Sequence, residues 1–141
     1  MRQYLELRER HGPAEAREIA LSGLPERQAA RLGPLIGSAS LAEGLSAAVP
    51  GLAAVGITTD FVDVSTEAED AALEIMLTCT CRVAAEGLGL AETEAEPVLC
   101  ELDLLATERA FPDLDVRVLA RQTDRRNVCV FRFARPRLET T

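Results

Sequence analysis

With 141 residues, of which 48% are hydrophobic and 27% charged, the chain is predicted to form a single domain with a core of its own. The formal net charge of −8 argues against nucleic acid and anionic membrane surfaces as partners, because phosphate groups require a basic face. The sequence contains no lysine, which excludes Schiff-base chemistry and a phosphate-loop lysine.

The N-terminal part, residues 1–55, is predicted to be helical. Residues 2–32 show apolar side chains at helical spacing and are expected to form two or three helices. The prolines that suit the first turn of a helix are Pro13 and Pro25. Residues 33–37 are rich in glycine and predict a loop. Ser40 and Glu43 then fit a capping box, which opens a further apolar helical stripe ending near Leu52.

The pattern changes to strands after Gly56. Residues 57–65 are rich in Ile, Thr, Phe and Val, and residues 71–79 alternate between two sets of side chains. We expect these strands to pair as a hairpin across the polar turn between them. One face of the second strand is expected to lie against the helices, and it carries Ala71, Leu73, Ile75, Leu77 and Cys79.

Two helices and a second hairpin are expected in the remainder of the chain. A short helix is predicted within residues 80–89, and a longer one from Pro97 to about Ala110. Strands at 114–122 and 127–134 are expected to form a second hairpin. The predicted fold class is therefore α+β. We expect an antiparallel sheet of about four strands, made of two hairpins and covered on one face by helices.

The single domain would span residues 1–141, with a sheet-containing part at 57–135 that holds all four cysteines. Strand alternation places Cys79 and Cys129 in the layer between the sheet and the helices. Cys81 lies at the start of a predicted helix, where backbone N–H groups and the helix dipole would stabilise a thiolate. Cys100 lies early in the longer helix, on a polar flank.

Two other interpretations of the cysteines stay open. Free cysteine is often a small buried hydrophobe, so inert packing would also explain these positions. A zinc site is less favoured, because the spacing of Cys79 and Cys81 is tighter than structural zinc sites use.

Carboxylates and arginines near the cysteines could complete a site. Asp103 follows Cys100 by one helical turn among apolar neighbours, where partial burial would raise its pKa and suit it to proton transfer. Seven of the 15 arginines lie between Arg117 and Arg137. They form either a solvated strand face or a rim in which Arg121 or Arg132 holds a substrate carboxylate.

Four segments within residues 70–135 form a characteristic series. They are Ile75-Met76-Leu77-Thr78-Cys79-Thr80-Cys81, Gly87-Leu88-Gly89-Leu90, Cys100-Glu101-Leu102-Asp103 and Cys129-Val130-Phe131-Arg132-Phe133. This series resembles the L-2-amino-thiazoline-4-carboxylic acid hydrolase-like family. The activity for which that family is named opens a thiazoline ring with water to give an S-carbamoyl cysteine. The resemblance implies that the family's recurrent positions are occupied here by Cys81, Cys100, Asp103 and Cys129.

The leading hypothesis is a small hydrolase that acts on a C=N bond of a small heterocycle through a cysteine thiolate. The predicted catalytic residues are Cys81, Cys100 and Asp103. The predicted substrate-binding residues are Cys79, Cys129, Arg121 and Arg132. The alternatives are a non-catalytic domain that binds a small ligand or assists another protein, and a cysteine-based metal sensor. Thiol reactivity and metal content would distinguish these three.

The expected partner is a small-molecule substrate, with a carboxylate as one candidate feature, and no cofactor or bound metal is expected. The first ten residues are charged and no apolar run reaches about 18 residues, so we expect a cytoplasmic protein with reduced cysteines. A homodimer formed through the alanine-rich helices is left open.

Overall fold

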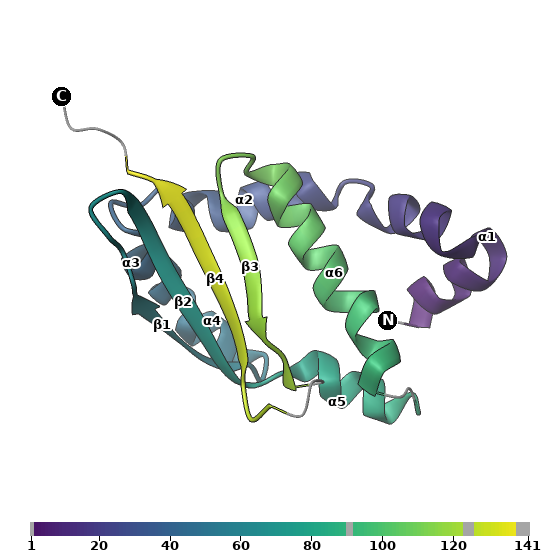
Figure 1. Cartoon of the computed structure of the whole chain (residues 1–141). Helices are drawn as coiled ribbons and strands as arrows, with labels where there is room; N and C mark the ends of the chain where they lie inside the picture. Colours follow the sequence, from purple (N-terminus) through teal and green to yellow (C-terminus); the bar gives the residue numbers. More distant parts are fainter. Residues whose placement is uncertain (1, 90–91, 123–125, 138–141) are drawn as a thin grey trace.

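The computed structural model describes residues 2–89, 92–122 and 126–137. Helices pack on a four-stranded antiparallel sheet (Figure 1), which confirms the predicted α+β class. The first elements are α1 (Arg2–Leu21), α2 (Leu24–Ile36), α3 (Leu41–Ser46) and α4 (Val49–Ala54). They are followed by β1 (Thr58–Asp63), β2 (Glu69–Thr78), α5 (Thr80–Gly87), α6 (Glu92–Ala110), β3 (Asp115–Ala120) and β4 (Cys129–Pro136).

The N-terminal helices agree with the prediction at Pro13 and Pro25 but differ from it at Gly33-Pro34. Gly12 has a φ of 79° and a ψ of 166°, so α1 is kinked there and Pro13 begins its second piece. Helix α2 runs on through Gly33-Pro34, where the sequence predicts a loop, and ends at Ile36. Ile36 is buried in the core, and this packing outweighs the local preference of Gly-Pro for a loop.

Ser40 begins the next helical segment as predicted. Its Oγ accepts a hydrogen bond from the backbone N–H of Glu43 at 3.2 Å, which is one of the two bonds of a capping box. The apolar stripe that follows is divided between two short helices, α3 and α4. Pro50 lies in the first turn of α4, where its missing N–H costs no helical hydrogen bond.

Helix α6 begins at Glu92, earlier than the predicted start at Pro97. The added turn contains glutamate and alanine, which favour helix.

The sheet joins two hairpins through their inner strands. The strand order is β1-β2-β4-β3, and every neighbouring pair is antiparallel. The hairpins β1–β2 and β3–β4 are those the sequence predicts. In the central β2–β4 pair, Ala72 lies opposite Phe133 and Met76 lies opposite Cys129.

In the described part of the chain, helices cover one face of this sheet (Figure 1), and the covered face of β2 is not the predicted one. The main core joins α2 and α3 to Ala72 of β2 and Val116 of β3. Side chains alternate along a strand, so Ala72 and Glu74 share the covered face, while Leu73, Ile75 and Leu77 lie on the opposite face. Leu77 is 56% exposed. The prediction that Leu73, Ile75 and Leu77 face the helices is therefore wrong, because the residues between them face the helices instead.

A second, smaller core fixes helix α6. The buried residues of this cluster come from α1 and α6, and they are Tyr4, Ala16, Leu21, Leu102 and Ala106. This contact packs the middle of α6, where Cys100 and Asp103 lie, against α1.

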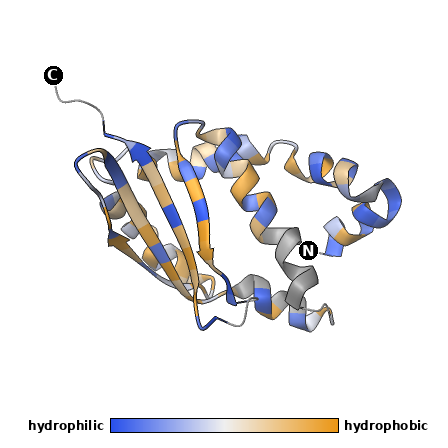
Figure 2. Ribbon diagram, viewed as in Figure 1, coloured by the Kyte–Doolittle hydropathy of each residue, from blue (hydrophilic) through white to orange (hydrophobic). Residues whose placement is uncertain are grey.

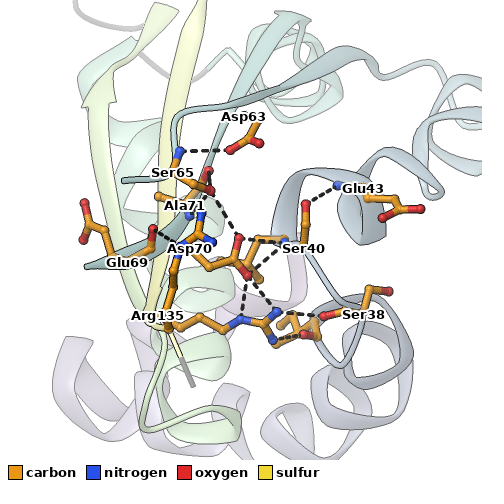
Figure 3. A network of polar contacts seen from close by, with 12 residues as sticks. Ser38, Ser40, Glu43, Asp63, Ser65, Glu69, Asp70, Ala71 and Arg135 are labelled. Atoms are coloured by element: carbon orange, nitrogen blue, oxygen red, sulfur yellow. Dashed lines mark hydrogen bonds and ion pairs between the residues drawn. The ribbon is translucent and has the colours of Figure 1, made fainter. Parts of the chain in front are cut away.

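A buried ion pair ties the sheet to the connection between α2 and α3 (Figure 3). The carboxylate of Asp70 accepts hydrogen bonds from Arg135 Nε at 2.8 Å and from the backbone N–H of Leu41 at 3.1 Å. Arg135 also donates to the carbonyls of Ile36 and Ser38. These contacts join β2, β4 and the first turn of α3 at the end of the sheet opposite the cysteines.

In the described part of the chain, no single helix is long and apolar enough to cross a membrane. The segments Leu24–Ile36 and Leu41–Ala54 meet the length and composition criteria only together, with a bend of 114° between them.

Candidate functional site

Three cysteines from separate elements come together at one end of the covered face. Cys79 directly follows β2, Cys129 is the first residue of β4, and Cys100 lies in α6. The Cys129 thiol is hydrogen-bonded to Cys79, and both Cys79 and Cys100 contribute to its electrostatic environment. Cys129 is buried and the other two are half-buried, and each of the three carries a thiol rather than a disulfide.

Gln122 holds this end of the sheet in place. Its backbone N–H donates to the Sγ of Cys129 at 3.3 Å. Its side-chain Nε2 donates to the carbonyl of Leu77 at 2.8 Å and to that of Asn127 at 3.1 Å. Gln122 therefore positions Cys129 against the end of β2. Sequence reasoning missed it, because a single glutamine after a strand has no distinctive pattern.

Two of the three thiols are held in the protonated form. Burial, with smaller contributions from Cys79 and Asp103, raises the pKa of Cys100 to about 11. The hydrogen bond to Cys79, together with burial, raises the pKa of Cys129. Neither thiol is a resting thiolate near neutral pH, because the thiolate is the minor form well below the pKa. The proton held on Cys129 leaves Cys79 as the acceptor of their hydrogen bond.

A buried carboxyl group, Glu74, lies on the same covered face. Its side chain is almost enclosed, and its Oε1 accepts a hydrogen bond from Thr59 Oγ1 at 3.1 Å. Burial raises the pKa of Glu74, and nearby Asp103 and Cys79 add to the rise, while Thr59 and Arg31 lower it. The predicted strand phase, with Leu73 and Ile75 towards the helices, would put Glu74 on the outer face of β2, so the error in phase concealed it.

Asp103 belongs to a polar group between α2 and α6. Gln28 Nε2 donates to Asp103 Oδ1 at 2.6 Å and to Thr107 Oγ1 at 3.2 Å. Arg31 Nη2 lies 3.6 Å from the same carboxylate oxygen, and its guanidinium donates to Gln28 Oε1. Gln28 is buried, and its hydrogen bonds link Arg31 to Asp103 across the interface between α2 and α6.

The pKa of Asp103 is raised as predicted, with desolvation as the main cause and with Arg31 and Gln28 opposing it. Its side chain is nevertheless 64% exposed, so we expect a smaller rise than for the enclosed Glu74. Gln28 lies 75 positions before Asp103 in the chain, and no local pattern links the two residues.

Arg132 does not join the cysteines. It alternates with Phe131 and Phe133 along β4, so it lies on the face of the sheet away from the helices. There it bonds to Glu69, and its Nη1 lies 3.8 Å from Asp115 Oδ2. Its predicted role in holding a substrate at the thiols does not fit this position.

Arg121 and Cys81 are the remaining predicted site residues. Arg121 is half-buried directly after β3, beside Gln122. Cys81 lies in the first turn of α5, and its side chain falls outside the described part of the structure.

A metal centre and a ligand cleft are two further kinds of functional site. Among residues 2–89, 92–122 and 126–137, no group of three His, Cys, Asp or Glu side chains is arranged to hold a metal ion. An apolar cleft of about 400 Å³ lies at the far end of α6, next to Phe111 and Leu114. Its one arginine, Arg135, is engaged with Asp70 and two carbonyls, so the cleft offers no uncommitted cation to a ligand.

Comparisons with known proteins do not add to this picture. The chain matches no protein-family model, and searches of the curated proteins and of the solved structures found no significant match. Function is therefore argued from the site itself.

Proposed function

We propose that this protein is a thiol-dependent hydrolase that opens a C=N bond in a small heterocycle, with Cys79 as the attacking sulfur. The observation that carries the proposal is the hydrogen bond between Cys129 and Cys79 beside the buried carboxyl of Glu74. A nucleophile, a thiol that donates to it and a proton donor are the parts that such chemistry requires.

Two features favour Cys79 over the other described cysteines. It accepts the hydrogen bond of Cys129, and such a bond is strongest when the acceptor is a thiolate. It also directly precedes α5, and its carbonyl accepts the backbone N–H of Val83 at 3.5 Å. The positive end of the helix dipole stabilises a thiolate at this position. Cys100 would then line the site rather than attack.

Glu74 is the proposed acid and base. In its protonated form it would donate a proton to the ring nitrogen as the sulfur of Cys79 forms a bond to the ring carbon. The lone pair of the 2-amino group then expels the ring nitrogen, which takes a second proton from solvent and leaves as an amine. Water adds to the resulting cationic carbon and gives one proton to the Glu74 carboxylate and the other to solvent. The carbon–sulfur bond to Cys79 breaks, which leaves a carbonyl on the product and restores the thiolate. A raised pKa suits Glu74 to both steps, because the acid form stays populated closer to neutral pH.

Arg31 is the proposed partner of a substrate carboxylate, in place of Arg132. Its charge acts on both Glu74 and Asp103, so it belongs to this group of residues. Its side chain is largely exposed and reaches the site from α2. Its Nε and Nη2 donate to Gln28 Oε1, so a substrate carboxylate would bind at Nη1 or replace Gln28 at the guanidinium, and this contact would orient the ring.

The resemblance to the L-2-amino-thiazoline-4-carboxylic acid hydrolase-like family supports this substrate class. The proposed substrate is a five-membered ring with a C=N bond and a carboxylate. Within the resemblance, Cys100, Asp103 and Cys129 would keep the family's recurrent positions, while Cys79 takes the attacking role.

The test is hydrolysis of 2-amino-thiazoline-4-carboxylate by the purified protein, followed as appearance of the ring-opened product. We expect Cys79→Ser to lower kcat about 10³-fold or more. Glu74→Gln should lower it roughly 10²- to 10⁴-fold. Glu43→Gln, at an exposed carboxyl group of α3 away from the cysteines, is the matched control for Glu74→Gln and should stay close to wild type. Undiminished turnover by Cys79→Ser, or no turnover of this ring and of related cyclic amidines by the wild type, would refute the proposal.

A non-catalytic domain that binds the same kind of ligand is the second candidate. It is favoured by the protonated state of Cys100 and Cys129, which suits cysteines that only line a site. Calorimetry would then show binding of the thiazoline carboxylate without any turnover. Loss of that binding in Arg31→Ala would locate the ligand at the same residues.

A further inference from the structure

We infer that the sheet face turned away from the helices is the interface of a homodimer. This open face is formed by strand residues that alternate with those of the core. Its apolar members are Val62 of β1, Leu73, Ile75 and Leu77 of β2, Leu119 of β3 and Val130 of β4. In the described part of the chain, no helix lies in front of these strands in Figure 1.

The polarity of β2 is the opposite of what a sheet with one solvated face shows. Such a sheet normally buries its apolar series and exposes its polar one. Here the covered face of β2 holds Asp70 and Glu74, while the outer face holds Leu73, Ile75 and Leu77. Apolar positions run along β2, β4 and β3 in Figure 2. Burial of this series would remove apolar surface from water, and exposed patches of this kind mark interaction sites.

Charge favours a second copy as the occupant. In a two-fold dimer the same patch meets itself, so a patch with a strong net charge would repel its partner. The chain as a whole carries −8, but four of the five charged strand residues on the open face form two ion pairs, and the fifth is the exposed Asp60 of β1. Arg132 bonds to Glu69, and Arg117 Nε lies 2.8 Å from Asp115 Oδ2. Arg117 and Arg132 against Asp60, Glu69 and Asp115 leave the open face with one net negative charge, so it offers little attraction to a strongly charged partner and only a small repulsion to its own copy.

The area is adequate for a reversible dimer. Strands rise about 3.3 Å per residue and lie about 4.8 Å apart, so the four strands present a flat footprint of about 400–500 Å² per copy. Projecting side chains make the accessible area of the face larger than this flat footprint. Two copies would then bury a total area near the lower limit for specific interfaces, about 1,200 Å². Two such faces would stack about 10 Å apart, like the sheets of a β-sandwich. We therefore expect a dissociation constant on the order of micromolar.

Sedimentation equilibrium of the full chain tests the inference. At about 100 µM, the wild type should sediment as a dimer. Leu77→Arg and Val62→Arg each place a charge on the open face and should raise the dissociation constant at least about tenfold. Val55→Arg is the matched control, because Val55 is 65% exposed at the end of α4, on the helical side of the sheet. It should leave the dimer intact.

Circular dichroism would establish whether each variant is folded. The two substitutions lie on different strands, so if one variant misfolds, the other still tests the interface. A wild type that stays monomeric at this concentration overturns the inference. A dimer that survives both open-face substitutions also overturns it, because its interface must then lie elsewhere.

Discussion

The ion pair between Asp70 and Arg135 should be the most sensitive polar contact for stability. Asp70 is only 7% exposed, and Asp70→Ala removes the acceptor of bonds from Arg135 and from the N–H of Leu41. Breaking a buried ion pair by removing one partner costs about 3–5 kcal/mol. Arg135 keeps its bonds to the carbonyls of Ile36 and Ser38, so we place this part at about 3 kcal/mol.

The lost bond at the start of α3 adds to that cost. Leu41 is the first residue of the helix, and the removal of a side chain that accepts from a helix N-terminus costs about 1 kcal/mol. The sum is about 4 kcal/mol. For a domain of this size, 1 kcal/mol shifts the thermal midpoint by about 3 °C, so Asp70→Ala should lower Tm by about 12 °C.

Urea and thermal unfolding followed by far-ultraviolet circular dichroism, at one fixed protein concentration, would measure both quantities. Glu69→Ala is the control. It breaks the more exposed pair with Arg132 on the open face and should cost about 1 kcal/mol or less. A loss below about 1 kcal/mol for Asp70→Ala would refute the reasoning, since the buried pair would then behave as a surface one.

The remaining predictions concern one titrating group and two glycines. Burial raises the folded-state pKa of Glu74 above the unfolded value. The unfolding free energy of the wild type should therefore fall as the pH rises from about 4.5 through the folded pKa of Glu74, and Glu74→Gln should lack this fall when urea unfolding is compared at low and neutral pH. Gly44→Ala should destabilise the protein by about 3 kcal/mol, because a Cβ there would lie 1.9 Å from the carbonyl oxygen of Leu35. Gly51→Ala meets nothing within 4 Å in helix α4 and should stabilise it by about 0.5–1 kcal/mol. Equal midpoints for the two glycine variants in urea would contradict the close contact at Gly44.

Most of the fold could be read from local signals. The kink before Pro13, the cap at Ser40 and both hairpins follow from residues that are neighbours in sequence. The errors arise where tertiary contacts decide. Helix α2 passes through Gly33-Pro34 because Ile36 is buried beyond it.

The phase of β2 shows why local pattern was insufficient. The Leu73–Leu77 series is the more apolar of the two faces, and an isolated strand would be expected to bury it. The helices instead contact Ala72, while Glu74 and Asp70 obtain buried partners from β1, α3 and β4. Those partners are distant in sequence, so the compensation was not visible there.

The candidate site was only partly predictable for the same reason. Cys129 was placed correctly, because it alternates with Phe131 along β4. Cys79 reaches the covered side although its strand phase was misassigned, since β2 ends at Thr78 and alternation no longer applies beyond it. Arg31 and Gln122 come from other elements, and only the folded chain brings them to the site.

The proposed reaction requires a reactive thiolate on Cys79, while Cys129 and Cys100 hold their protons. The most direct measurement is the rate at which iodoacetamide modifies each thiol at pH 7 in a folded Cys81→Ser variant, resolved by peptide mass spectrometry. We expect Cys79 to react first, and the other two at least about tenfold more slowly. Modification of Cys100 or Cys129 as fast as Cys79, or silence of all three thiols until the protein is unfolded, would contradict the claim.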